Sequence, residues 1–112
     1  MESETIQYIP KALQDRLIAL GFTELSERTV SHEGKAFTEY GITIEQAERW
    51  IWKEHRELFP NVFNTGEEVD EWESFVIDYR SERFLDPFSA RLAGVERVIE
   101  MLEQRQTTNQ QS

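Results

Sequence analysis

The stretch VDEWESFVIDYRSERFLDPFSARLAGVERVIEMLEQ, residues 69–104, joins a strand pattern to the longest amphipathic helix pattern in the chain. Between residues 72 and 80, large apolar side chains recur at every second position, which is the signature of a half-buried strand. The face expected to point inward carries Phe75, Ile77 and Tyr79. This strand is therefore expected to offer an apolar surface to the helix that follows it.

Asp86 and Pro87 mark the start of that helix, because a carboxylate accepts from free backbone N–H groups and a proline suits the first helical position. Apolar residues then recur every three or four positions, which predicts one apolar stripe on a helix. The members of this stripe are Phe88, Leu92, Val95, Ile99 and Leu102. Such a stripe needs a sheet face to cover, and the preceding strand supplies one.

The elements before this stretch are shorter. Leucine spacing predicts a helix from about Pro10 to Leu20, and Gly21 suits the left-handed residue that ends a helix. Residues 22–40 read as a hairpin that turns at 33–34, or alternatively as an irregular loop with one short strand.

A second helix is predicted from the capping box of Thr43 and Gln46 to about Leu58. Its apolar stripe comprises Ile44, Ala47, Ile51, His55 and Leu58, with Trp50 and Trp52 on opposite shoulders. A short strand at 62–63 and a turn at 64–66 then lead into the strand pattern of residues 72–80.

The element order α-β-β-α-β-β-α predicts an α+β fold, a two-layer sandwich in which helices pack on a small antiparallel sheet. We expect one such domain over residues 1–104. Residues 105–112 are polar and lack periodicity, which predicts a disordered tail.

The chain has a net charge of −10 and no cysteine. Contacts to phosphate require clustered Lys and Arg, so direct binding to nucleic acid or to an anionic membrane is not expected. Disulfides and thiolate metal sites are excluded. The chain shows no signal-peptide pattern and no apolar run of about 20 residues, so we expect a soluble cytoplasmic protein.

Acidic residues are concentrated in residues 61–86, where eight acids against two arginines contribute −6. The predicted partner-binding set is Glu67, Glu68, Asp70, Glu71, Glu73 and Asp78. We expect these side chains to bind a basic surface of another protein, with nucleic-acid mimicry as the extreme form. The alternative is that the acids only keep the protein soluble. Their spacing does not match a calcium loop, so no metal is expected.

No pattern of catalytic residues stands out. The chain lacks a GxSxG elbow, an HExxH pair and a glycine-rich phosphate loop, which predicts a non-enzymatic protein without a cofactor. An alternative of a different class is a small-molecule-binding or sequestering protein whose aromatic pocket is lined by Trp52, His55 and Trp72. His55 is otherwise expected to be partly buried beside a tryptophan. A homodimer remains open as a further partner.

Six short stretches within residues 9–103 carry a resemblance to other proteins. They are residues 20–22, 46–50, 53–55, 72–79, 86–90 and 93–96. These stretches resemble a group of small uncharacterised proteins that is common in phages and mobile elements of Bacteroidetes-type bacteria. The resemblance implies an accessory phage-type protein in the cytoplasm of a bacterial host cell. It supplies no catalytic residue.

Overall fold

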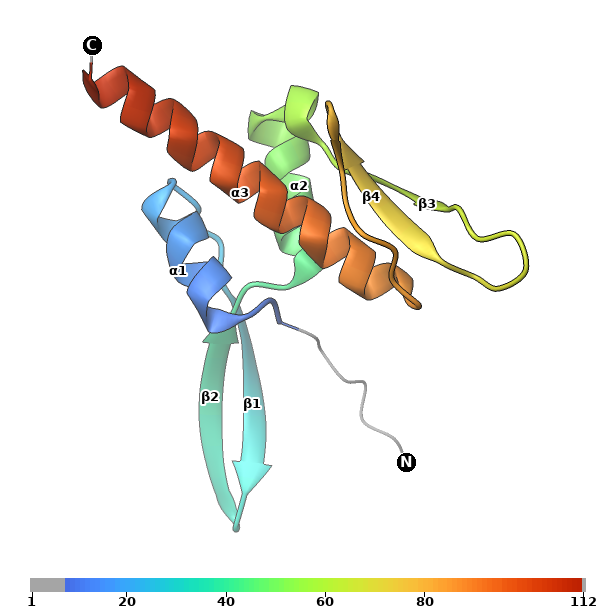
Figure 1. The fold of residues 1–112 in the computed structure, drawn as a ribbon. Helices are drawn as coiled ribbons and strands as arrows, with labels where there is room; N and C mark the ends of the chain where they lie inside the picture. The colour runs from blue at the N-terminus through green and yellow to red at the C-terminus, as the bar shows by residue number, and fades with distance from the viewer. Residues whose placement is uncertain (1–7, 112) are drawn as a thin grey trace.

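The computed structural model describes residues 8–111 of the chain (Figure 1). The elements are α1 (Lys11–Ala19), β1 (Ser26–His32), β2 (Lys35–Gly41), α2 (Ile44–Glu54), the 3-10 helix η1 (Arg56–Leu58), β3 (Asn61–Asn64), β4 (Trp72–Val76), β5 (Tyr79–Arg80) and α3 (Pro87–Gln111). This succession confirms the predicted α+β class and the order α-β-β-α-β-β-α, to which η1 and the two-residue β5 are added.

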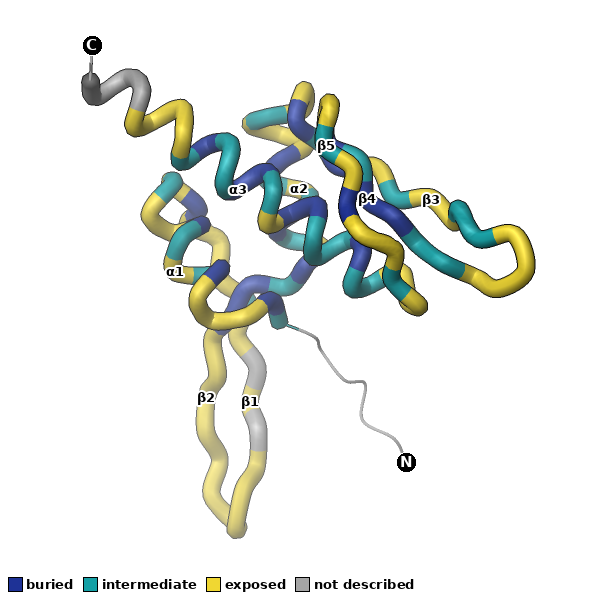
Figure 2. Tube along the Cα trace, in the orientation of Figure 1, coloured by how far each residue is buried: buried dark blue, intermediate teal, exposed yellow. Residues whose placement is uncertain are grey.

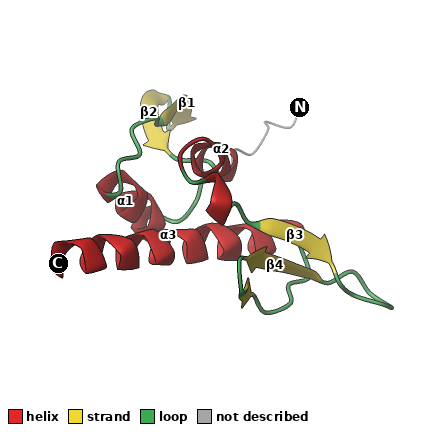
Figure 3. Cartoon of the chain, turned by 90° about the horizontal axis from the view of Figure 1, so that it is seen from above, coloured by secondary structure: helices red, strands yellow, loops and turns green. Residues whose placement is uncertain are grey.

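Helix α3 is the element that holds the others together. Strands β3, β4 and β5 form an antiparallel sheet in that order, and α3 packs against β3 and β4. The same helix contacts α1 and α2 (Figure 3). The predicted packing of an α+β fold on a small antiparallel sheet is therefore confirmed, with α3 as the helix that covers the sheet.

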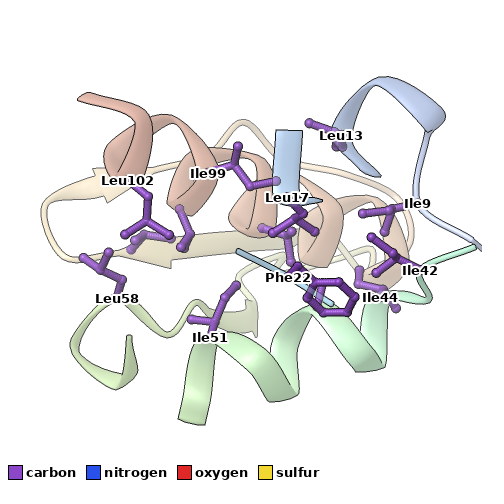
Figure 4. Packing of buried hydrophobic residues seen from close by; sticks show 14 residues of the cluster. Ile9, Leu13, Leu17, Phe22, Ile42, Ile44, Ile51, Leu58, Ile99 and Leu102 are labelled. Carbon is purple, nitrogen blue, oxygen red and sulfur yellow. The ribbon is translucent and has the colours of Figure 1, made fainter. Parts of the chain in front are cut away.

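One hydrophobic core fills the space between these elements (Figure 4). Its members come from all three α-helices, from η1 and β4, and from the connecting segments. They are Ile9, Leu13, Leu17, Phe22, Ile42, Ile44, Ala47, Ile51, Leu58, Val76, Val95, Val98, Ile99 and Leu102. Phe88 and Leu92, the first two members of the predicted α3 stripe, are half-buried at the edge of this core.

The helix ends follow the local signals of the sequence. Gly21 has a φ of +109°, and the N–H of Phe22 donates to the carbonyl of Leu17 at 3.1 Å, which completes the expected glycine-terminated cap of α1. At α2, Thr43 Oγ1 accepts from the N–H of Gln46 at 3.1 Å, and Gln46 Oε1 accepts from the N–H of Thr43 at 2.9 Å. The predicted capping box is thus confirmed.

Ion pairs join α3 to each of the earlier helices α1, α2 and η1. Arg16 of α1 pairs with Glu103 at 2.5 Å, Glu48 of α2 with Arg91 at 2.5 Å, and Glu57 of η1 with Arg105 at 3.2 Å. The guanidinium of Arg16 lowers the pKa of Glu103 through a hydrogen bond. Each pair joins residues far apart in the sequence and lies at the edge of the contact between α3 and a shorter helix.

Strands β1 and β2 form a separate two-stranded sheet. They pair from Ser26 opposite Gly41 to His32 opposite Lys35. The turn residues Glu33 and Gly34 both have positive φ, 52° and 77°, as a two-residue turn of type I′ requires. The predicted turn at 33–34 is confirmed. The hairpin projects from the body, and residues 31–40 are all exposed (Figure 2).

The prediction of one long strand over residues 72–80 is wrong. Strand β4 ends at Val76, and the next residue, Ile77, has a φ of 53° and begins the turn that leads into β5. The predicted inward face is also wrong. Ser74 and Val76 are fully buried, whereas Phe75 lies on the opposite face and Ile77 is 60% exposed. The alternation of side chains predicts a strand with two different faces, but the face that packs against α3 is the one that carries Ser74 and Val76.

Two predicted helix ends also move. Helix α2 ends at Glu54, because His55 has φ −140° and ψ 51° and breaks the helical path before η1. Helix α3 continues to Gln111, where the sequence predicted a disordered tail from residue 105. Ser112 lies outside the described residues.

Gly94 sets the distance between α3 and the sheet. A Cβ atom at this position would lie 2.7 Å from the Pro60 Cβ atom and closer still to Ser74 Oγ. We expect Gly94→Ala to lower the free energy of unfolding by about 1–2 kcal/mol. Contacts this short place the overpacking cost in the upper part of its usual range, about 2–3 kcal/mol, and alanine's helix propensity returns about 1 kcal/mol. Urea unfolding of the two proteins measures this difference.

The double variant Ser74→Ala/Gly94→Ala is the matched control. Ser74 Oγ is buried and has no hydrogen-bond partner in the described part of the chain, so its removal relieves the closest clash without breaking a bond. We expect the double variant to recover part of the loss. A Gly94→Ala protein as stable as the parent would contradict the close approach of α3 and β4.

Candidate functional site

Glu73, at the centre of the predicted acidic surface, is paired within the molecule. Its side chain is 1% exposed although it projects from the face of β4 that α3 does not cover. Both carboxylate oxygens accept from Arg80, and Oε1 also accepts from Arg83 Nε at 3.0 Å and from Thr65 Oγ1 at 2.8 Å. The carboxylate is therefore a structural group and is not available to a partner.

This environment changes the acidity of the group. The Arg80 guanidinium, together with hydrogen bonds from Thr65 and Arg83, lowers the pKa of Glu73 to about 2 from 4.5. Glu71 lies beside the same cluster, 3.8 Å from Arg83. Two of the six predicted partner-binding acids thus face arginines of their own chain.

The remaining predicted acids lie at opposite ends of β4. Glu67, Glu68 and Asp70 are exposed in the loop that joins β3 to β4, where Asn64 Nδ2 donates to Asp70 Oδ1 at 2.8 Å. Asp78 is exposed in the turn between β4 and β5. The structure therefore does not gather the predicted set into one continuous acidic surface.

The three residues of the predicted aromatic pocket do not share a pocket either. Trp52 is 49% exposed and contacts Phe59, with ring centroids 5.3 Å apart, while the Arg56 guanidinium lies 4.5 Å from its ring centroid. Trp72 belongs to β4, on another part of the molecule. His55 packs edge-on against Trp50 at 5.0 Å, which confirms the expectation of a partly buried histidine beside a tryptophan.

His55 and Trp50 line a cavity of about 500 Å³ at the end of α1. Its charged side chains are Glu24, Arg49, Lys53 and Glu54, two acids and two bases. Because the charges balance, the cavity does not select an anionic or a cationic ligand.

A larger groove of about 590 Å³ lies between α3 and residues 79–84. Its apolar part is formed by half-buried side chains from both walls: Tyr79, Phe84, Phe88 and Leu92. Its acidic part is formed by Glu82, Glu96 and Glu100. The groove therefore combines an apolar surface with three carboxylates.

Hydrogen bonds to β4 hold the wall opposite α3 in place. The N–H of Phe84 donates to the carbonyl of Trp72 at 2.8 Å, and the N–H of Trp72 donates to the carbonyl of Phe84 at 2.7 Å. Ser81 Oγ accepts from the N–H of Ser74 at 2.8 Å. Residues 81–84 thus run alongside β4 beyond the end of β5.

Arg97 is the one cation among the residues that line this groove. Its guanidinium lies 5.3 Å from the centroid of the Tyr79 ring and pairs with Glu100 at 3.2 Å. Its Nε atom is buried and makes no hydrogen bond to the described residues. With three acids against one base, the groove carries a net negative charge.

Sequence reasoning missed this groove. The acids of residues 61–86 included Glu82, but no sequence pattern brings residue 82 to residue 96. The available signal was the spacing of Leu92, Glu96 and Glu100, which places acids beside the apolar stripe of a helix.

No protein-family model, curated protein or solved structure matches the chain. Within residues 8–111, none of the helices has the length and apolar character that crossing a membrane requires. The described residues also contain no group of three or more His, Asp or Glu side chains placed to hold a metal ion.

Glu73 makes stability depend on pH in a defined direction. Because its pKa is lowered in the folded state, its contribution is complete above about pH 4.5 and is lost as the pH falls toward about 2. We expect Glu73→Gln to lower the stability near pH 7 and to reduce the additional loss between these two pH values. Urea midpoints measured from pH 7 to pH 2 test both effects.

The matched control is Glu67→Gln, which removes the same charge from an exposed loop position. This variant should lose as much stability as the parent between pH 4.5 and pH 2. A Glu73→Gln protein with the parent's pH profile would show that the buried carboxylate is not the group that titrates.

Proposed function

We propose that this protein is a small, non-enzymatic interaction protein that binds a segment of another protein carrying basic and apolar side chains. The observation that carries the proposal is the groove between α3 and residues 79–84, where four apolar side chains lie beside Glu82, Glu96 and Glu100. Apolar contacts supply affinity in such a groove, and the carboxylates select lysine or arginine on the partner.

The size of the groove indicates what kind of segment it takes. Its lining on α3 extends from Phe88 to Glu100, about 18 Å along a helix axis. An extended chain covers that distance with about five residues. A short linear segment with alternating apolar and basic side chains therefore fits the groove better than a broad folded surface does.

The exposed acids outside the groove have a supporting part in this proposal. Glu67, Glu68, Asp70 and Asp78 add to the field of a chain whose net charge is −10, and such a field accelerates the approach of a basic partner. Nucleic-acid mimicry is less favoured, because it needs an unbroken row of free carboxylates and Glu73 is paired with Arg80 and Arg83. The small-molecule alternative rests on the cavity beside His55, whose balanced charges give it no preferred ligand.

A pair of synthetic peptides tests the proposal. Both contain alternating apolar residues; in one the intervening residues are lysine and arginine, in the other aspartate. We expect the basic peptide to shift the amide resonances of Phe84, Leu92 and Glu96 in a two-dimensional NMR titration. The acidic peptide should leave them unchanged.

Two double variants with the same change in net charge separate the groove from the loop. Glu82→Gln/Glu96→Gln should weaken binding of the basic peptide by about tenfold, because two desolvated charge contacts are lost. Glu67→Gln/Glu68→Gln should slow association and leave the dissociation rate nearly unchanged. If the loop variant lost affinity and the groove variant did not, the groove would not be the binding site.

A further inference from the structure

The hairpin of β1 and β2 is exposed, and in residues 8–111 it packs against no other sheet. Residues 31–40 are all exposed, and within the described chain β2 pairs with β1 alone. Phe37 is 49% exposed and Tyr40 is 63% exposed. An isolated two-stranded hairpin is at best marginally stable in water, and its outer edge is a template for a further strand.

The sequence of β2 is complementary to itself. In Lys35-Ala36-Phe37-Thr38-Glu39, the first, third and fifth residues share one face of the strand. When two copies of β2 run antiparallel about Phe37, Lys35 of each copy lies opposite Glu39 of the other. The two Phe37 rings then lie opposite each other between two pairs of opposite charge, which are favourable cross-strand contacts.

The backbone of β2 favours the same register. In a hairpin closed by a two-residue turn, the flanking residues His32 and Lys35 exchange backbone hydrogen bonds. Alternation along β2 then directs the backbone groups of Phe37 toward β1 and those of Ala36 and Thr38 toward the open edge. In the Phe37-centred register, Ala36 of one copy lies opposite Thr38 of the other, so the outward donors and acceptors meet.

The charge distribution allows two copies to approach each other at this edge. The chain carries −10, which opposes association of two copies through most of their surface. Residues 26–41, however, hold three acids and two bases, and the one lysine and one glutamate of β2 cancel. The hairpin is therefore nearly neutral on a strongly acidic molecule.

We propose that the outer edge of β2 is a self-association surface, and that a second copy of this chain pairs with it antiparallel in the Phe37-centred register. The product is a four-stranded sheet with two-fold symmetry, in which both copies use the same strand. This surface is separate from the groove of α3, so either proposal can fail without the other.

Charge-reversal variants of the full chain test the register. Sedimentation over a concentration series should show the parent moving from 13.3 kDa toward twice that mass. Lys35→Glu places carboxylates opposite each other, and Glu39→Lys does the same with lysines, so each variant should weaken the dimer at least about tenfold. An equimolar mixture of the two variants should dimerise again, because each acidic edge then meets a basic one.

Recovery in the mixture separates the proposed pairing from a failure of either variant to fold. Lys53→Glu, an equal charge change on the exposed side of α2, is the matched control and should dimerise like the parent. Slowed amide exchange of Ala36 and Thr38 at high concentration would further support the register. A parent that stays monomeric, or a mixture that does not recover, would overturn the proposal.

Discussion

The close approach of α3 to β4 at Gly94 is the constraint on which the remaining structure depends. A helix can lie this near to its neighbours only where it carries no side chain, and here Gly94 meets Ser74 of β4 and Pro60, which precedes β3. Once this distance is set, Val76 and Val95 are both fully buried. No helix of the described chain covers the opposite face of the sheet. There Arg80 and Arg83 bury the carboxylate of Glu73, and Phe75 contacts Phe63.

The arrangement of charge follows from that architecture. Several arginines are held in pairs within the chain: Arg16, Arg91 and Arg105 join α3 to the elements before it, and Arg80 and Arg83 cover a glutamate of β4. A chain with 22 acids and 12 bases therefore leaves its surface acidic after these pairs are made. The negative charge of the groove and of the exposed loop thus depends on which acids the arginine side chains pair with, as well as on the number of acids.

Local signals predicted the fold well, and distant ones did not. The caps at Gly21 and Thr43 depend on atoms no more than five residues apart, so the sequence alone predicts them. The inward face of β4 does not follow from alternation, because Ser74 faces inward where it packs against Gly94, a glycine twenty residues away. The same holds for the candidate site. The sequence shows the acids as a group, but the ion pair of Glu73 with Arg83 and the proximity of residues 82 and 96 in the groove arise only from tertiary structure.

The exposed hairpin also bears on how the protein unfolds. Residues 31–40 bury no side chain in the common core, so opening β1 from β2 breaks a backbone ladder without disturbing the packing around Ile51 or Ile99. Segments of this kind open at a lower free energy than the whole molecule, and they form a cooperative unit of their own. We therefore expect the hairpin to open at a lower free energy than the body that it joins where Ile42 re-enters the core.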